Sequence, residues 1–224
     1  MGGETPSPFQ NGGNVDRKAL LAMMYRGPRG EDVMRLKFRF KRSMQAVAYL
    51  LKLDGGTMNY TKLIKMLYIA DREWMAKRAD PITGDVVFAM KMGPVLSDVL
   101  HLIKDEHELS RVWSQFIRTN EDDKSVTLID DPGDGELSTG VIAKLGDVYE
   151  KYRKLDYKQI SSLTHTFPEW IQHDPGKKSR KLIPWEDILR AQGREKMISY
   201  IEDATREDAE IDYLTEHSFV ASPF

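Results

Sequence analysis

A long amphipathic pattern between Asn59 and Ala79 predicts the central helix of the fold. Apolar residues recur there every three or four positions, as one face of an α-helix requires: Leu63, Met66, Leu67, Ala70 and Trp74. Further apolar residues widen this stripe, so that other elements are expected to surround the helix: Ile64, Tyr68 and Met75. Asn59 is a suitable N-cap residue. The remaining polar face of the helix holds Lys62, Lys65, Asp71 and Arg72.

The segment before this helix predicts a second helix and leaves two interpretations of its lead-in. Ser43 is expected to cap a helix that carries Met44, Val47 and Leu51 on one face. Apolar and basic residues alternate through RLKFRFKR at residues 35–42, which fits either an edge strand with a solvated basic face or an extended lead-in. The mostly apolar residues 19–25 are expected to form a short helical turn.

The stretch VVFAMKMGPVLSDVLHLI, residues 86–103, predicts a short strand or extended connector over Val86–Met90, followed by a helix. Gly93 is expected to cap that helix and Pro94 to take its first position. A phosphate-binding loop is the alternative, but it needs several glycines and free backbone N–H groups. This stretch has one glycine, and Pro94 removes one donor, so the plain helix start is preferred.

Later segments add more helix and one hairpin. WSQFIRTN and SVTLIDD flank EDDK and predict a β-hairpin over Trp113–Asp130. Helices are expected after Ser138, after Asp156, from Pro184 to Gly193, and from Arg194 onward. The predicted fold class is mainly α, a compact helical domain with a minor β-hairpin or small sheet. Residues 1–34 are expected to be a partly disordered N-terminal extension, 35–210 the domain, and 211–224 a C-terminal tail.

Composition and charge narrow the possible function classes. The chain has 224 residues and no cysteine, which excludes disulfides, thiolate metal sites and cysteine nucleophiles. A net charge of −2 argues against a nucleic-acid partner. No apolar run approaches the roughly 20 residues needed to span a bilayer, and no signal peptide is visible, so no membrane association and a cytoplasmic location are expected.

The sequence offers no catalytic, cofactor or metal site. His101 and His107 are six residues apart and do not share a helix face, so metal independence is expected. No GxSxG, triad or kinase pattern is present. His165 is interpreted as a hydrogen-bonded structural group rather than a functional one. The protein is therefore predicted not to be an enzyme.

The order of three motifs resembles the Panacea domain of the SocA-like antitoxins. These motifs are KLIKMLYIADREW at 62–74, PITGD at 81–85 and MKMGPV at 90–95, and LSTGVIAKLGDVYEKY and LTHTFPEW further along resemble the family's later segments. The resemblance runs over roughly residues 38–193. The usual leucine of the first motif is Met66 here, a substitution that packing tolerates.

The resemblance implies a non-catalytic antitoxin of a toxin–antitoxin system, of a kind also found in prophages, whose partner is a cognate toxin protein. It implies neutralisation by direct protein–protein binding, or a second route in which the antitoxin is a proteolytic adaptor that delivers the toxin to a ClpXP-type protease. A DNA-binding autorepressor of its own operon and an enzyme that uses His165 are the alternatives. The absence of a helix-turn-helix argues against the first, and the absence of a nucleophile against the second.

We expect the toxin to bind where a fixed turn meets charges that the core does not need. These predicted partner-binding residues are Lys65, Asp71, Arg72, Lys91, Gly93, Pro94 and Val95.

Overall fold

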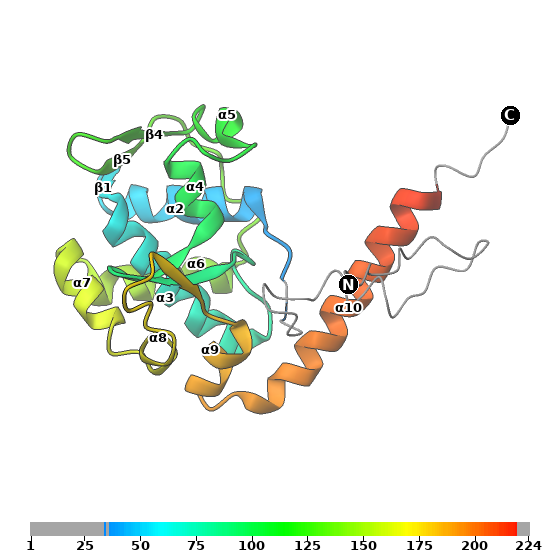
Figure 1. The fold of residues 1–224 in the computed structure, drawn as a ribbon. Coiled ribbons are helices and arrows are strands. Elements are labelled where there is room, and N and C mark those ends of the chain that lie inside the picture. The colour runs from blue at the N-terminus through cyan, green and yellow to red at the C-terminus, as the bar shows by residue number, and fades with distance from the viewer. Residues whose placement is uncertain (1–33, 35, 219–224) are drawn as a thin grey trace, which may run out of the picture. The chain divides into compact units, whose positions relative to one another are not determined.

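The computed structural model describes residue 34 and residues 36–218. It separates into two compact units, and residues 36–198 form the larger one (Figure 1). The described residues are mostly helical, with helices α2 Phe40–Leu53, α3 Tyr60–Arg78, α4 Ser97–Ile103, α5 Ser110–Trp113, α6 Thr139–Tyr152, α7 Tyr157–Thr164, α8 Pro168–Gln172, α9 Trp185–Ala191, a 3-10 turn η1 Glu195–Met197 and α10 Ile198–Ser218. The strands are β1 Thr57–Asn59, β2 Val87–Met90, β3 Gly93–Leu96, β4 Ile117–Asn120, β5 Ser125–Leu128 and β6 Arg180–Leu182. The predicted turn over 19–25 lies outside the described residues.

Helix α3 is the central helix, as its pattern predicts. Asn59 caps it by accepting hydrogen bonds from the Thr61 and Lys62 N–H groups at 3.0 and 3.2 Å. Thirteen of its nineteen residues are buried, and they lie on all sides of the helix, because α2, α6, α7, α9 and β3 pack around it. The apolar stripe therefore marks a helix enclosed by the rest of the unit.

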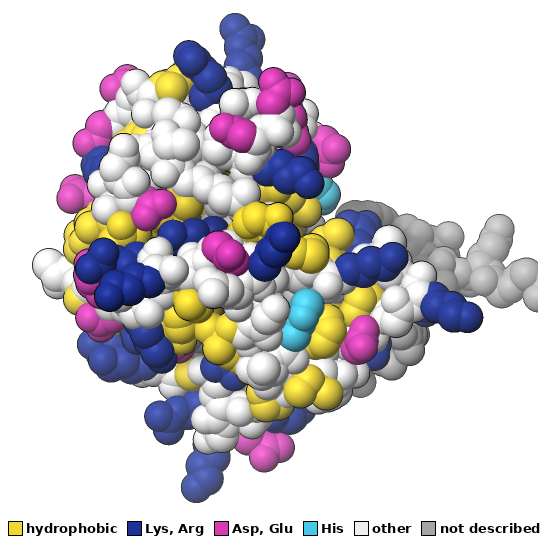
Figure 2. All heavy atoms as spheres, turned by 90° about the vertical axis from the view of Figure 1, so that its left-hand side faces the viewer, with side chains coloured by type: hydrophobic (Ala, Val, Ile, Leu, Met, Phe, Trp, Pro, Cys, Tyr) yellow, Lys and Arg dark blue, Asp and Glu magenta, His cyan; other side chains and the backbone are white. Residues whose placement is uncertain are grey.

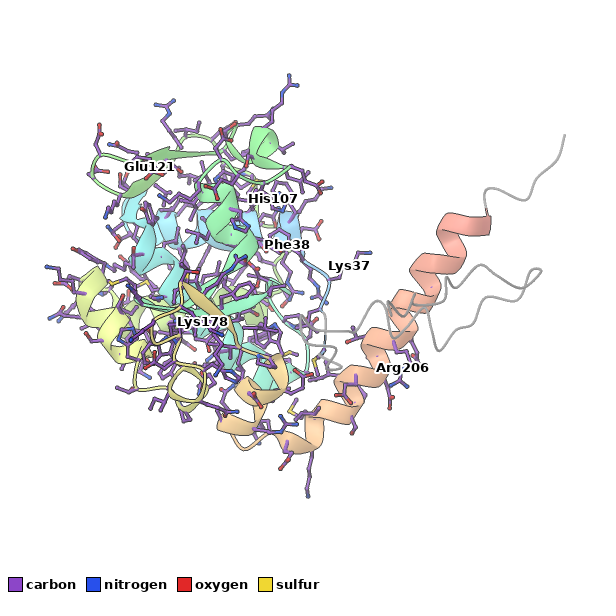
Figure 3. The ribbon with its side chains drawn as sticks, in the orientation of Figure 1. Lys37, Phe38, His107, Glu121, Lys178 and Arg206 are labelled. Carbon is purple, nitrogen blue, oxygen red and sulfur yellow. The ribbon has the colours of Figure 1, made fainter. Side chains whose placement is uncertain are left out.

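Helix α2 begins earlier than predicted. Its first residue is Phe40 and its N-cap is Arg39, whereas Ser43 lies buried inside the helix. The residues before it are an extended lead-in rather than a strand, and the Arg39 N–H donates to Thr83 O at 2.8 Å. The Phe38 ring packs on His107 with centroids 5.8 Å apart (Figure 3). This tertiary contact and the bond to Thr83 hold the lead-in.

The predicted hairpin is confirmed and belongs to a three-stranded antiparallel sheet in the order β1-β5-β4. Its two long strands pair from Ile117 opposite Leu128 to Asn120 opposite Ser125. Strand β1, directly before α3, adds a third strand along β5. This sheet therefore fixes where the central helix starts.

The second sheet, in the order β3-β2-β6, corrects the prediction for residues 93–96. Gly93 and Pro94 do not begin a helix: they start strand β3, and Ala89 of β2 lies opposite Pro94. Pro94 is tolerated because β3 is an edge strand, and Gly93 has a φ of +96° directly after the turn. Helix α4 begins at Ser97 instead.

Helices α6, α7 and α9 begin where predicted, whereas the short helices α5 and α8 were not predicted. Ser138 caps α6, and Asp156 forms a capping box at the start of α7. Pro184 precedes α9, whose Trp185 donates its indole N–H to Asp85 O at 3.0 Å. Strand β6 was missed, because it lies in a segment that reads as a basic loop.

Helix α10 is described by itself beyond residue 198. It is one continuous helix to Ser218 and therefore extends past residue 210, the predicted end of the domain. Inside it, Thr205 donates its hydroxyl to Ile201 O at 2.6 Å, and Arg206 pairs with Asp203 at 3.2 Å (Figure 3). These local contacts support the helix along its own length.

Candidate functional site

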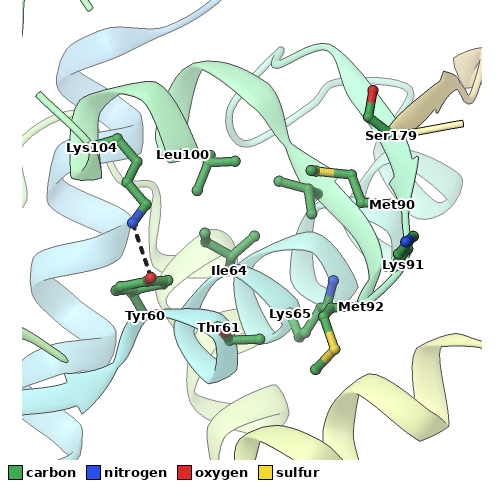
Figure 4. A pocket seen from close by; sticks show the side chains of 11 residues that line it. Tyr60, Thr61, Ile64, Lys65, Met90, Lys91, Met92, Leu100, Lys104 and Ser179 are labelled. Atoms are coloured by element: carbon green, nitrogen blue, oxygen red, sulfur yellow. Dashed lines mark hydrogen bonds between the residues drawn. The ribbon is translucent and has the colours of Figure 1, made fainter. Parts of the chain in front are cut away.

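A pocket of about 470 Å³ opens between the first turns of α3, the β2–β3 hairpin and α4 (Figure 4). The described residues that line it are mostly apolar and include three lysines but no carboxylate: Tyr60, Thr61, Ile64, Lys65, Met90, Lys91, Met92, Val95, Leu100, Lys104 and Ser179. Its volume lies within the range of about 300–1,000 Å³ that is typical of ligand pockets. We refer to it below as the hairpin pocket.

The three lysines of the hairpin pocket differ in their surroundings. Lys104 donates to the Tyr60 hydroxyl at 3.0 Å (Figure 4). It also forms an ion pair with Glu121 at 2.8 Å. Lys91 is exposed on the hairpin turn, and its side chain pairs with no other described residue. Lys65 is buried and belongs to the core of the site.

Lys65 joins the central helix to the hairpin. It is 1% exposed, and its Nζ donates to Pro94 O at 2.6 Å. Burial lowers the pKa of its amine to about 7, because a charged ammonium loses hydration there. Gly93 leaves the space that this contact needs: a Cβ at that position would lie 2.5 Å from Thr164 Oγ1 and 3.1 Å from Lys65 Nζ. Helix α3, the β2–β3 hairpin and α7 therefore meet at Gly93, where a larger side chain would not fit.

About two helical turns further along α3, a buried ion pair joins the helix to α8. Arg72 binds both oxygens of Glu169, at 2.5 Å through Nε and 3.2 Å through a terminal nitrogen. Tyr68 donates its hydroxyl to the same carboxylate at 2.8 Å, and the Arg72 guanidinium lies 4.6 Å from the centre of the Phe167 ring. Glu169 is completely buried, and these partners satisfy both of its oxygens. Burial and the neighbouring carboxylate raise the pKa of Tyr68 well above its usual value.

Two buried carboxylates hold the turn before β2 in place. Asp71 accepts the N–H groups of Ile82 at 2.6 Å and Thr83 at 3.1 Å, and also the Thr83 hydroxyl. Asp85 accepts the N–H groups of Asp98 and Val99 at 2.8 and 2.9 Å, and so binds the first turn of α4. Burial raises the pKa of Asp71 to about 6 and that of Asp85 to about 8. The turn is thereby tied to both helices.

His165 packs against a tryptophan on the other side of the hairpin. Its ring stacks on Trp170 with centroids 4.1 Å apart, and the Trp170 indole N–H donates to Met90 O at 3.3 Å. Burial, together with the nearby charge of Lys65, lowers the pKa of His165. The stacking is a packing contact, but His165 Nε2 is buried without a hydrogen-bond partner among the described residues, so the ring is not fully hydrogen-bonded as expected.

The structure divides the seven predicted partner-binding residues. Lys91 is exposed at the mouth of the hairpin pocket, and Val95 lines its wall with 8% of its surface exposed. The other five are buried or engaged inside the fold: Lys65, Asp71, Arg72, Gly93 and Pro94. The assumption that the core does not need the charges on α3 is therefore wrong, because each of them bonds another segment. Partner binding at this surface remains a prediction.

Eight of the eleven described residues that line the pocket were not among the predicted site residues: Tyr60, Thr61, Ile64, Met90, Met92, Leu100, Lys104 and Ser179. Met92 is 45% exposed on the hairpin turn, beside Lys91. An exposed turn at Lys91–Met92 would have followed from recognising β3 as a strand. All four residues of β3 are buried, however, so no alternation of apolar and polar residues reveals it.

Two other kinds of site are absent from the part of the chain that the structure describes. No helix there is both long and apolar enough to cross a membrane. Nor do three or more of its His, Asp and Glu side chains come together as possible metal ligands.

The described fold is thus a mostly helical domain in which buried polar side chains join α3 to the hairpin and to α8, beside an apolar pocket with lysines. Residues 63–171 match the family model of the antitoxin SocA-like Panacea domain. This segment is therefore similar to the Panacea domain of the SocA-like antitoxins, as the motifs predict. Searches of curated proteins and of solved structures found no match.

The matched segment contains the residues that form these buried connections, from Lys65 to Trp170. The motifs KLIKMLY, PITGD, GPV and LTHTFPEW therefore specify the contacts between α3, the hairpin and α8. The family match supports an antitoxin role in a toxin–antitoxin system with a toxin as partner, and it suggests a non-catalytic regulator.

Proposed function

We propose that this protein is a cytoplasmic antitoxin that neutralises its cognate toxin by direct binding, and that the toxin covers the mouth of the hairpin pocket. The proposed location of the toxin rests on the residues of the turn between β2 and β3. There, an exposed lysine that pairs with no other described residue, Lys91, and a half-exposed methionine, Met92, stand beside an apolar cavity. Exposed apolar surface next to a cavity is typical of interaction sites.

The fold also favours this surface because its backbone is fixed. Lys65 and Gly93 hold the hairpin against α3, and Trp170 bonds its other side at Met90. A rigid surface loses little conformational entropy when a partner binds. A stable complex needs an interface of at least about 1,000 Å², so the toxin must extend beyond the pocket onto the neighbouring surface.

Co-expression with a toxin encoded beside this gene tests the role. We expect the antitoxin to rescue growth and the two proteins to copurify. The same rescue in cells that lack the ClpXP protease supports direct neutralisation. Rescue that depends on the protease, with toxin accumulating in its absence, would instead support the adaptor route.

A charge reversal at the hairpin tests the location. Lys91→Glu should weaken toxin binding at least fivefold, or about 1 kcal/mol, while the melting temperature stays the same. Lys77→Glu is the matched control: Lys77 is exposed near the other end of α3, about 24 Å from Thr61 at 1.5 Å per residue. Arg72 is unsuitable for this test, because its reversal would leave Glu169 buried without its cation. Full toxin binding by folded Lys91→Glu would move the interface elsewhere, and deletion of residues 1–34 would then be examined.

A further inference from the structure

The hairpin pocket is locally positive in a chain of net charge −2. Its described lining holds three lysines and no carboxylate, although burial lowers the pKa of Lys65 to about 7. The positive charge at the mouth therefore comes mainly from Lys91 and Lys104. Ser179, at its edge, stands between two more basic residues, Lys178 and Arg180, and Figure 3 shows Lys178 on the loop before β6. Glu121 offsets one of these charges by pairing with Lys104. The pocket therefore favours an anionic partner and disfavours a cationic one.

The interior of the pocket favours an apolar group. Ile64, Leu100 and Val95 contribute aliphatic surface, and Met90 and Met92 supply flexible thioethers that can adapt to different shapes (Figure 4). Figure 2 shows hydrophobic side chains among charged side chains of both signs on the face that lies at the left of Figure 1. An occupant would thus place an apolar group inside and negative charge at the mouth.

We propose that the hairpin pocket binds a segment of the toxin in which a large apolar side chain is flanked by aspartate or glutamate residues. The apolar side chain would displace water from Ile64 and Leu100. The flanking carboxylates would meet Lys91, which has no partner within the described residues, and the basic loop around Lys178. This proposal rests on the proposed antitoxin function and adds the chemistry of the contact.

A nucleic acid is the other polyanion that lysines could attract. Its phosphates would meet the lysines but would leave the apolar interior of the pocket unfilled. Of the described residues that line the pocket, Tyr60 alone is aromatic, and it is buried and bonded to Lys104, so it offers no open face on which bases could stack. The apolar interior therefore favours the acidic protein segment.

The test uses the full chain labelled with ¹³C at the methionine methyl groups, because Met90 and Met92 line the pocket. The probes are two capped peptides, Glu-Glu-Leu-Phe-Leu-Glu-Glu and Lys-Lys-Leu-Phe-Leu-Lys-Lys. We expect the acidic peptide to shift both methyl signals and to bind about tenfold more tightly than the basic one at low salt. The difference should shrink in about 0.5 M salt, because the lysines near the mouth are screened.

Two variants separate the effect of charge from non-specific peptide binding. Lys91→Glu should weaken the acidic peptide about fivefold, and Lys77→Glu should leave it unchanged. Equal affinity for the two peptides, or no response of the Met90 and Met92 signals, would overturn the proposal. So would a single-stranded oligonucleotide that shifts these signals more strongly than the acidic peptide does.

The co-expression assay distinguishes the two proposals. Rescue and copurification without peptide binding would leave the antitoxin role intact. They would exclude the pocket as the site that binds an acidic segment. If the acidic peptide binds but there is no rescue or copurification, the acidic segment that the pocket binds does not come from the toxin.

Discussion

Replacement of Lys65 by methionine tests whether the central helix carries a neutral lysine in the folded protein. The side chain is 1% exposed and donates to Pro94 O at 2.6 Å. Methionine keeps a similar length and removes the amine. It also leaves the Pro94 carbonyl without its donor, which costs about 1–3 kcal/mol at every pH.

The expected pH dependence follows from the lowered pKa. Burial moves the pKa of Lys65 from 10.5 in the unfolded chain to about 7 in the fold. Between these values the unfolded state binds more protons, so the amine makes the free energy of unfolding rise with pH. Below about pH 7 the amine is charged in both states, and burying it lowers the free energy of unfolding by the full amount. At about 1.4 kcal/mol per pKa unit the whole shift corresponds to about 5 kcal/mol, of which about 2 kcal/mol is recovered between pH 7 and 9.

Urea unfolding of both proteins at pH 7, 8 and 9 measures this contribution. The free energy of unfolding of the original protein minus that of Lys65→Met should rise by about 2 kcal/mol over this range. Other titrating groups, including Asp85, are present in both proteins and largely cancel. Lys77→Met, at an exposed position, should show a constant difference. A constant difference for Lys65→Met as well would refute the reasoning, because it would mean that the buried amine stays charged beside the Pro94 carbonyl.

Three further substitutions test the core around the site, each by urea unfolding. Glu169→Gln should lower the free energy of unfolding by about 3–5 kcal/mol, because it leaves the Arg72 guanidinium without its buried counter-charge. Gly93→Ala should cost at least about 1–3 kcal/mol, since its Cβ would lie 2.5 Å from Thr164 Oγ1 at a φ of +96°. Leu67→Ala should cost about 2–5 kcal/mol, because Leu67 is fully buried on α3.

Matched controls separate these causes from general effects. Glu150→Gln removes an exposed carboxylate paired with Arg153 and should change the free energy of unfolding little. If Glu169→Gln has no larger effect than this control, the buried ion pair does not stabilise the fold. Gly133→Ala changes a glycine with φ of +74° and open space around it, so it reports backbone strain alone. If Gly93→Ala costs no more than this control, the close packing at Thr164 is not limiting. A change below about 0.5 kcal/mol for Leu67→Ala would contradict its place in the core.

Much of the fold could be predicted because its signals are local. The Asn59 cap, the apolar stripe of α3, the Asp156 capping box and the hairpin around EDDK each lie within a short stretch of the chain. Such patterns depend on contacts between residues three or four positions apart, or across one turn. The motif order was also sufficient to identify the family, which the matched segment confirms.

The failures occurred where distant contacts decide the local structure. Gly93-Pro94 has a good helix-start sequence, yet β2 pairs with it and α3 and α7 cover it. Strand β6 forms because Phe88 lies opposite Leu182, far along the chain. In both cases the hydrogen bonds and burial offered by another segment outweigh local propensity.

Local sequence patterns establish that the chain is mostly helical, where its central helix lies and which family motifs it carries. The tertiary structure decided which charges on that helix are available to a partner. Lys65, Asp71 and Arg72 look like a solvated face, because helical spacing shows only that they avoid the apolar stripe. In the fold, Pro94, Thr83 and Glu169 arrive from other segments and bury them, since a polar group can enter the core when a partner satisfies it there. Lys91 stays exposed because it lies on the turn between two strands, a position that only the pairing of β2 with β3 creates.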